Sequence, residues 1–125
     1  MSTLHGKCIL VVEDEALIAM LVEDILSDLG ANVVGPAGSI DQALAIAASC
    51  QIDAAVLDVN IRGRTIDPVA ALLLGRGIPI VFATGYGQNA SVRIHGMPII
   101  EKPYTADRIA EALNIALAAT HQPDR

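Results

Sequence analysis

Cysteine, histidine and aromatic residues are all scarce in this chain of 125 residues, and the scarcity excludes several kinds of site. The two cysteines, Cys8 and Cys50, belong to no metal-binding or redox motif, and we expect both to be reduced and mostly buried. The three histidines, His5, His95 and His121, lack the spacing of metal ligands or of a phosphodonor, and we expect them at the surface. A zinc site, which prefers Cys or His ligands, is therefore not expected.

Basic residues are also few. The chain has 8 Lys and Arg against 14 Asp and Glu, which gives a net charge of -6 at pH 7. Nucleic acids and anionic membranes are bound by basic surfaces, so we expect no nucleic-acid partner and no membrane association. No apolar run is long enough to span a membrane, and the N-terminal residues lack the pattern of a signal peptide. We therefore expect a cytoplasmic protein.

What the chain has in abundance is aliphatic residues. Hydrophobic residues make up 53% of the sequence but aromatic residues only 2%, so the core must consist of Leu, Ile, Val and Ala. A chain of this length fits one domain. We expect a single domain over residues 1–125, with a core from about residue 7 to about residue 119 and no linker or internal repeat.

Short apolar runs alternate with segments of helical periodicity along the chain. Runs of four to six mostly aliphatic residues predict strands buried on both faces, as parallel sheets require. Their alternation with helices predicts an α/β fold, with a doubly wound five-stranded parallel sheet and helices on both faces. The predicted strands are residues 8–12, 32–35, 53–58, 78–83 and 98–101, and the predicted helices are residues 15–29, 40–49, 68–74 and 106–119.

Capping residues mark the ends of these helices. Gly30 stands where a left-handed C-cap belongs, and Ser39 with Gln42 three residues later predicts a capping box. Asp67, directly before a proline, is the predicted N-cap of the third helix. Thr105 is the predicted N-cap of the last helix.

Charged residues follow three of the predicted strands. Glu13 and Asp14 come after the first strand, Asp58 ends the third, and Lys102 follows the fifth. The carboxyl ends of parallel strands meet at one edge of the sheet, where ligands of open α/β sheets bind. Clustered carboxylates need a cation, and magnesium suits oxygen ligands better than zinc. A duller alternative is that Glu13 and Asp14 only complement the dipole in the first turn of a helix.

The pattern, together with Thr84 after the fourth strand and a proline after Lys102, resembles the receiver domain of two-component response regulators, the CheY-like family, over nearly the whole chain. The resemblance implies a flavodoxin-like (βα)5 sandwich in which Asp58 accepts a phosphoryl group. It also implies that Lys102 pairs with the phosphoryl oxygens and that Thr84 hydrogen-bonds them after phosphorylation.

The same resemblance implies a magnesium site. Asp14, Asp58 and the backbone carbonyl of Asn60 would bind the ion, and Glu13 would contribute through water. Phosphoryl transfer depends on positioning and on charge neutralisation, which these groups supply. The phosphodonor would be a histidine kinase or a histidine phosphotransfer protein.

The chain also departs from the usual receiver pattern. Ile99 stands where receivers commonly carry an aromatic switch residue, three positions before the lysine. Glycines interrupt the segment of residues 85–97, so we expect a shortened or irregular fourth helix. Residues 82–86 read Phe-Ala-Thr-Gly-Tyr, which resembles a subgroup of free-standing receivers linked to stress signalling. We expect the bond between Lys102 and Pro103 to be cis.

These observations favour a single-domain response regulator rather than a turnover enzyme. Its output would be binding of a downstream protein, whose identity the sequence does not reveal, or diversion of phosphoryl groups from a shared kinase. One alternative is a degenerate receiver that acts as a phosphorylation-independent binding module. Another is a phosphatase with Asp58 as nucleophile, although the haloacid dehalogenase type needs Asp-x-Asp where this chain has Glu13, Asp14 and Glu15.

Overall fold

The computed structural model describes residues 4–84, 99–101 and 105–120, and its elements follow the predicted alternation. The five predicted strands of the parallel sheet and the four predicted helices are all present. In chain order the elements are β1 (Cys8–Val12), α1 (Ala16–Asp28), β2 (Asn32–Ala37), α2 (Ile40–Ser49), β3 (Ala54–Asp58), β4 (Asn60–Ile61), β5 (Arg64–Thr65), α3 (Asp67–Gly75), β6 (Ile80–Thr84), β7 (Ile99–Glu101) and α4 (Ala106–Thr120).

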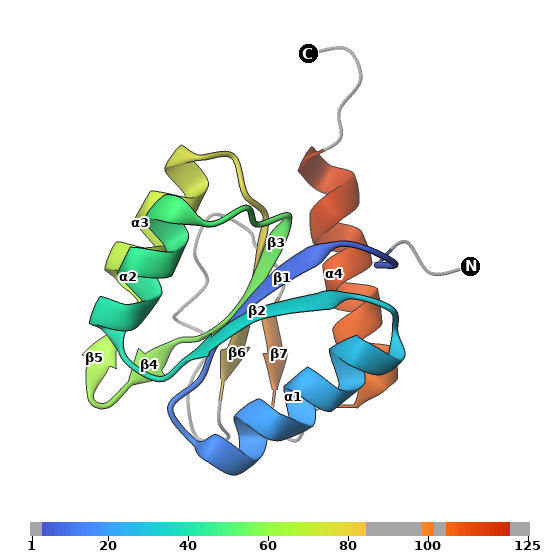
Figure 1. Cartoon of the computed structure of the whole chain (residues 1–125), viewed down its shortest axis with the longest axis horizontal. Coiled ribbons are helices and arrows are strands. Elements are labelled where there is room, and N and C mark those ends of the chain that lie inside the picture. Colours follow the sequence, from blue (N-terminus) through green and yellow to red (C-terminus); the bar gives the residue numbers. More distant parts are fainter. Residues whose placement is uncertain (1–3, 85–98, 102–104, 121–125) are drawn as a thin grey trace.

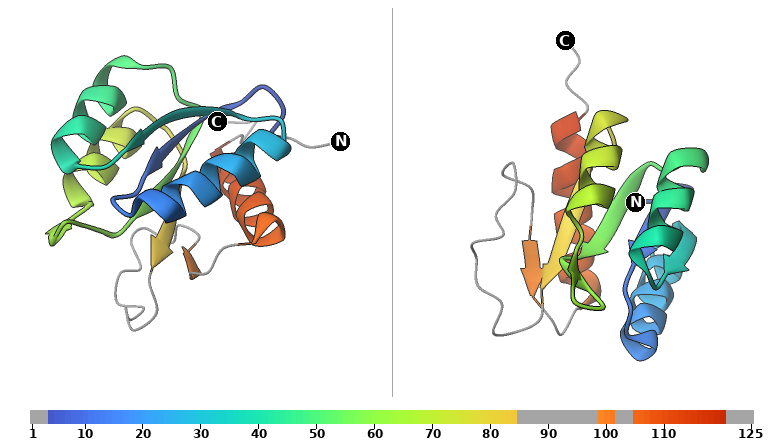
Figure 2. Two further views of the ribbon diagram at one scale, coloured as in Figure 1. Left: turned by 60° about the horizontal axis from the view of Figure 1, so that its bottom comes forward. Right: turned by 90° about the vertical axis from the view of Figure 1, so that its left-hand side faces the viewer.

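The main sheet has five parallel strands in the order β2-β1-β3-β6-β7, which confirms the predicted doubly wound α/β fold. Helices α2 and α3 cover one face, and α1 and α4 cover the other (Figure 1). The left view of Figure 2 shows the strands running between these helix pairs. No helix in the described part of the chain combines the length and apolar character needed to cross a membrane.

Alternating residues of each strand supply two aliphatic cores. On β1, Leu10 and Val12 pack toward α2 and α3, whereas Ile9 and Val11 pack toward α1 and α4. All five residues of β3 are buried, because helices cover both faces of a central parallel strand. Among the described residues, the largest fully buried side chain is Phe82, and aliphatic residues supply the rest of both cores. Cys8 and Cys50 are free thiols and only partly buried.

Strand register brings the predicted site residues to one edge of the sheet. Val12 pairs with Leu57, so the residues that follow them, Glu13 and Asp58, stand side by side. Asp58 in turn pairs with Ala83, the neighbour of Thr84. The acidic residues therefore meet because the neighbouring parallel strands β1 and β3 end at the same level.

The predicted cap residues are present except at α3, although the capping box at α2 has only one of its two bonds. The Ser39 hydroxyl accepts from the Gln42 amide at 3.1 Å, although the Gln42 side chain accepts from the Gly38 amide rather than from that of Ser39. Thr105 caps α4 by accepting from the Arg108 amide at 3.2 Å. Gly30 has the expected positive φ of 87°.

The prediction that Asp67 is the N-cap of α3 is wrong. Ile66 is the N-cap residue, and Asp67 is the first residue of the helix. The physical reason is packing: Ile66 is 1% exposed, and its amide bonds to the Val59 carbonyl at 3.1 Å, so the chain is fixed just before the helix. Asp67 then lies in the first turn, where its charge complements the helix dipole.

A short hairpin that was not predicted follows β3. Strands β4 and β5 pair antiparallel, with Asn60 opposite Thr65 and Ile61 opposite Arg64. The two turn residues, Arg62 and Gly63, have positive φ values of 53° and 79°. Positive φ at both central residues is typical of the tightest hairpin turns, which usually carry Asn-Gly or Asp-Gly. Arg-Gly is a weak signal for such a turn.

Two predictions about the backbone lie outside the described residues. These are the shortened or irregular fourth helix, which falls within residues 85–98, and the cis bond between Lys102 and Pro103. Both stay predictions.

Gly35 offers a test of backbone strain in the strand that leads to the site. It has φ of 95°, and an added Cβ would lie 2.9 Å from the Ala37 nitrogen and 3.2 Å from the Val11 oxygen. Gly35→Ala is therefore expected to lower the free energy of unfolding by about 3 kcal/mol, from the left-handed backbone and from overpacking together. Urea unfolding monitored by circular dichroism measures the change.

Gly77→Ala is the matched control. Gly77 has a similar φ of 78°, but a Cβ there would meet nothing within 4 Å. The expected loss is only about 1 kcal/mol, the cost of the backbone conformation alone. Equal losses in the two variants would show that the close approach to Ala37 and Val11 does not constrain Gly35.

Candidate functional site

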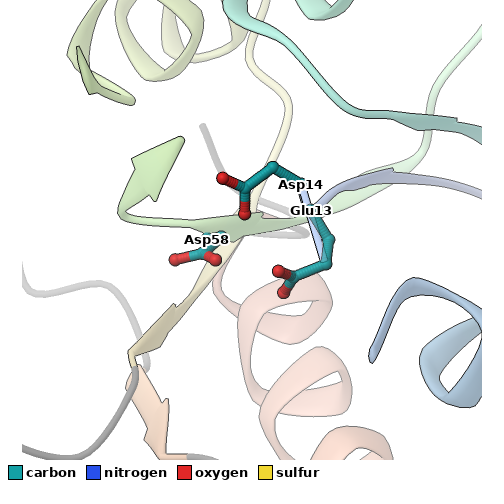
Figure 3. A group of neighbouring side chains, drawn as sticks. All are labelled: Glu13, Asp14 and Asp58. Atoms are coloured by element: carbon teal, nitrogen blue, oxygen red, sulfur yellow. The ribbon is translucent and has the colours of Figure 1, made fainter. Parts of the chain in front are cut away.

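Three carboxylates meet at the carboxyl edge of the sheet. Glu13 and Asp14 directly follow β1, and Asp58 is the last residue of β3 (Figure 3). One oxygen from each side chain can be chosen so that all three oxygens lie within 4.8 Å of one another. The sequence prediction that these residues converge is confirmed.

The backbone of this acidic pocket, defined as Glu13, Asp14 and Asp58, is held by the sheet. The Glu13 amide donates to the Ala37 carbonyl of β2 at 2.9 Å, which continues the β1–β2 pairing by one residue. Glu13 and Asp58 are 4% and 6% exposed, and they are the only buried charged residues in the described part of the chain. Asp14 is only partly buried. Two of the carboxylates are therefore shielded from water, and the third lies at the rim.

Each carboxylate is oriented by a backbone amide. The Glu15 amide donates to Glu13 Oε2 at 3.1 Å, and the Asn60 amide donates to Asp58 Oδ1 at 3.2 Å. The Arg62 amide donates to Asp14 Oδ2 at 2.8 Å. An ionised carboxylate has about four acceptor positions on two oxygens, so a bond from a backbone amide can orient it without preventing it from binding a cation.

The alternative assignment of Glu13 and Asp14 to the first turn of a helix is wrong. Helix α1 begins at Ala16 with Glu15 as its N-cap residue, and its first turn contains no acidic residue. Glu13 and Asp14 precede the helix and face Asp58 instead (Figure 3). Complementing the dipole of α1 does not explain their presence.

The remaining predicted residues are placed less completely. Asn60 is exposed at the start of β4, directly beyond the pocket, and its amide contacts Asp58. Thr84 ends β6 opposite Glu101 of β7, which puts its backbone at the same edge of the sheet. Ile99 is partly buried against the core beneath α2 and α3. Lys102 lies outside the described residues.

Arg62 is the residue at this site that sequence reasoning missed. Its amide reaches Asp14 only because the β4–β5 hairpin turns the chain back toward the end of β1. Gly63 is a residue common in turns, but the sequence around it does not indicate the contact with Asp14.

The charges of the pocket determine what it can bind. Two like unit charges 4 Å apart near a protein surface repel by about 4 kcal/mol. A cluster of three carboxylates therefore attracts a cation, and an all-oxygen donor set suits a hard divalent ion such as Mg²⁺. A carboxylate at such a position is also a nucleophile that can form an acyl phosphate.

Comparison with known proteins agrees with this geometry. The family profile described as the response regulator receiver domain matches residues 9–114. The solution structure of SdrG from Sphingomonas melonis Fr1 is 45% identical and superposes with a TM-score of 0.80, covering 94% of this chain and 99% of SdrG. A second SdrG structure, in a BeF3-activated conformation, is 46% identical with a TM-score of 0.75.

Two longer regulators are similar over most of this chain. The transcriptional regulatory protein PdtaR of Mycobacterium tuberculosis is 30% identical over 115 residues, which is 88% of this chain and 56% of PdtaR. The phyllosphere-induced regulator PhyR of Methylorubrum extorquens is 31% identical over 114 residues, 87% of this chain and 43% of PhyR. A solved structure of a protein described as the PhyR stress response regulator is 24% identical and has the same fold, with a TM-score of 0.81. The chain thus spans about half the length of these curated relatives.

Proposed function

The chain belongs to the response regulator receiver family, and from this premise we propose that Asp58 accepts a phosphoryl group in a magnesium-dependent reaction. The observation that carries the proposal is the acidic pocket: Asp58 ends the central strand of the sheet, buried beside Glu13 and Asp14. This triad is typical of the magnesium site of receivers. The BeF3-activated structure of SdrG supports the same chemistry, since beryllofluoride has the shape and charge of a phosphoryl group.

The donor set of the pocket fits magnesium. Mg²⁺ binds oxygen at about 2.0–2.1 Å, so ligands on opposite sides of the ion stand about 4.2 Å apart. The carboxylate oxygens lie within 4.8 Å of one another, so small side-chain shifts, or water between the ion and Glu13, bring them into range. We propose Asp14, Asp58 and the Asn60 carbonyl as direct ligands. When bound, the ion would neutralise the carboxylates and the oxygens of the incoming phosphoryl group.

The covalent step belongs to Asp58. A carboxylate oxygen of Asp58 attacks phosphorus, the bond between phosphorus and the donor imidazole nitrogen breaks, and the electron pair stays on that nitrogen. The product is an acyl phosphate on Asp58. We propose that Lys102 pairs with the phosphoryl oxygens and that the Thr84 hydroxyl hydrogen-bonds them afterwards. The burial of Asp58 restricts the directions from which the donor can approach it.

Family membership also defines the kind of partner. A receiver domain implies a histidine kinase as the source of phosphoryl groups, and receivers are normally acceptors rather than turnover enzymes. We propose that this receiver functions as a single domain, and that its output is contact with another protein or withdrawal of phosphoryl groups from a shared kinase. We also propose a place in the Phe-Ala-Thr-Gly-Tyr subgroup, on the motif at residues 82–86, and in stress signalling, since a PhyR of the same fold is described as a stress response regulator.

Intact-mass measurement tests the proposed function. Purified protein incubated with acetyl phosphate and Mg²⁺ is expected to gain the mass of one phosphoryl group, and chelation of Mg²⁺ by EDTA is expected to prevent the gain. A degenerate receiver that acts only as a binding module would gain nothing in either condition. A phosphatase would instead release inorganic phosphate from an added phosphomonoester over many turnovers.

A further inference from the structure

We propose that Arg62 is a positioning residue for the cation site: its backbone amide holds Asp14, and its guanidinium fixes the hairpin that carries this amide. The inference rests on the proposed function in one respect, because it takes the acidic pocket as the place where the cation binds. It adds a residue from the unpredicted β4–β5 hairpin to that site.

The bond between Arg62 and Asp14 joins two distant parts of the chain. The donor lies 48 residues after the acceptor, and at 2.8 Å it is the shortest of the three bonds from backbone amides to the pocket carboxylates. The other two amides lie only two residues from the carboxylates that they orient. Asp14 is also the most exposed of the three carboxylates, so its direction depends most on an external donor.

The Arg62 amide points at Asp14 because the hairpin has a fixed register. Ile61 lies directly before the turn, and Ile66 lies directly after β5. Both side chains are buried in the core beneath α2 and α3, with 1% of each exposed. These two anchors hold the base of the hairpin, while the turn itself is exposed. The φ of 53° at Arg62 reverses the chain at this point.

The Arg62 side chain makes a hydrogen bond that a glycine, the residue best suited to this backbone conformation, could not make. A left-handed φ is adopted most readily by Gly, Asn or Asp, so Arg at this position is strained. Its Nε donates to the Gly38 carbonyl, in the loop between β2 and α2, at 2.9 Å. Arg62 therefore joins the loops that follow β1, β2 and β3, and it stops the exposed turn from moving away from Asp14.

This arrangement has a consequence for cation affinity. Mg²⁺ tolerates little departure from octahedral geometry, so a ligand that is already oriented binds it with less loss of conformational freedom. Groups that orient metal ligands typically change affinity about tenfold to a hundredfold when they are removed. The guanidinium acts on Asp14 through the hairpin rather than directly, so we expect the lower end of this range.

Calorimetric titration of the full chain with Mg²⁺ tests the inference with two matched variants. Arg62→Gly keeps the amide and relieves the left-handed strain, but it removes the bond to Gly38. Arg64→Gly removes the same side chain and charge two residues further along the hairpin, where the arginine is also exposed. Arg62→Gly is expected to raise the dissociation constant of Mg²⁺ about tenfold, and Arg64→Gly is expected to leave it unchanged.

Urea unfolding without Mg²⁺ separates positioning from a purely structural role. A purely structural role would lower the unfolding free energy of Arg62→Gly and leave the Mg²⁺ affinity of the folded protein unchanged, which would overturn the inference. Equal loss of affinity in Arg62→Gly and Arg64→Gly would overturn it too, because the cause would then be charge alone. If the wild-type chain itself binds no Mg²⁺, the proposed function fails with it.

Amide hydrogen exchange on the wild-type protein gives a second, independent measurement. The Arg62 amide is expected to exchange slowly, because it is bonded to Asp14. Asp14→Ala should accelerate its exchange while the amide of Ile66, which bonds to Val59, keeps its rate. Fast exchange of the Arg62 amide in the wild-type protein would contradict the proposed contact.

Discussion

Asp58→Asn is expected to abolish phosphoryl acceptance completely. With acetyl phosphate and Mg²⁺ the wild-type chain should gain the mass of one phosphoryl group, whereas the variant should keep its unmodified mass. Asn has nearly the shape of Asp, and its side-chain oxygen can still accept from the Asn60 amide, so the variant should fold. Its amide has no anionic oxygen with which to attack phosphorus. Intact-mass spectrometry at several times of incubation measures the difference.

Asp53→Asn provides the matched control. Asp53 lies directly before β3, at the opposite end of the strand from Asp58, and its Oδ2 accepts from the Cys8 amide at 2.8 Å. An Asn can keep this bond through its own oxygen. The control variant is therefore expected to gain one phosphoryl group as the wild type does. A gain that persists in Asp58→Asn would place the acceptor elsewhere in the chain.

The sheet could be predicted because burial dictates the composition of its strands. All five residues of β3 are buried, and helices cover it on both sides, so nearly every position before Asp58 had to be aliphatic. The edge strand β2 was harder to delimit. It extends to Ala37 rather than to the predicted residue 35, since residues 35–37 are a Gly-Pro-Ala segment that reads as a turn.

The hairpin could not be predicted because tertiary packing creates it. Strands β4 and β5 have two residues each, too short for a periodic signal. Their pairing depends on Ile61 and Ile66, which are buried by α2, α3 and the sheet. The same packing explains why α3 begins at Asp67 rather than at the predicted Pro68.

The three carboxylates of the acidic pocket could be predicted from the sequence, but the backbone amide that orients Asp14 could not. Strand order and register follow from the fold, and they bring Glu13 and Asp58 together whatever their neighbours are. The amide that holds Asp14 comes from a residue 48 positions away, at a φ that arginine seldom adopts. No local pattern in the sequence encodes such a bond.

Mg²⁺ is expected to raise the melting temperature of the wild-type chain by about 10 °C, and Asp14→Ala is expected to lose this gain. A ligand that binds only the native state stabilises it by about 2.7 kcal/mol at a hundredfold excess over its dissociation constant. For a domain of this size that free energy corresponds to about 10 °C. Asp14 supplies one of the three carboxylates, so its removal takes away both charge and a ligand. Thermal unfolding monitored by circular dichroism, with Mg²⁺ and with EDTA, measures the gain.

Asp28→Ala is the control that distinguishes Mg²⁺ binding in the acidic pocket from general screening of the negative surface charge. Asp28 is exposed at the end of α1, outside the pocket, and its removal changes the net charge by the same amount as Asp14→Ala. If Mg²⁺ acts at the acidic pocket, Asp28→Ala should keep the full gain, because repulsion among Glu13, Asp14 and Asp58 is what the cation offsets. If Mg²⁺ only screens the acidic surface, the two variants should respond alike. An undiminished gain in Asp14→Ala, together with an undiminished gain in Asp28→Ala, would show that Asp14 is not a ligand of the cation and would contradict the proposed site.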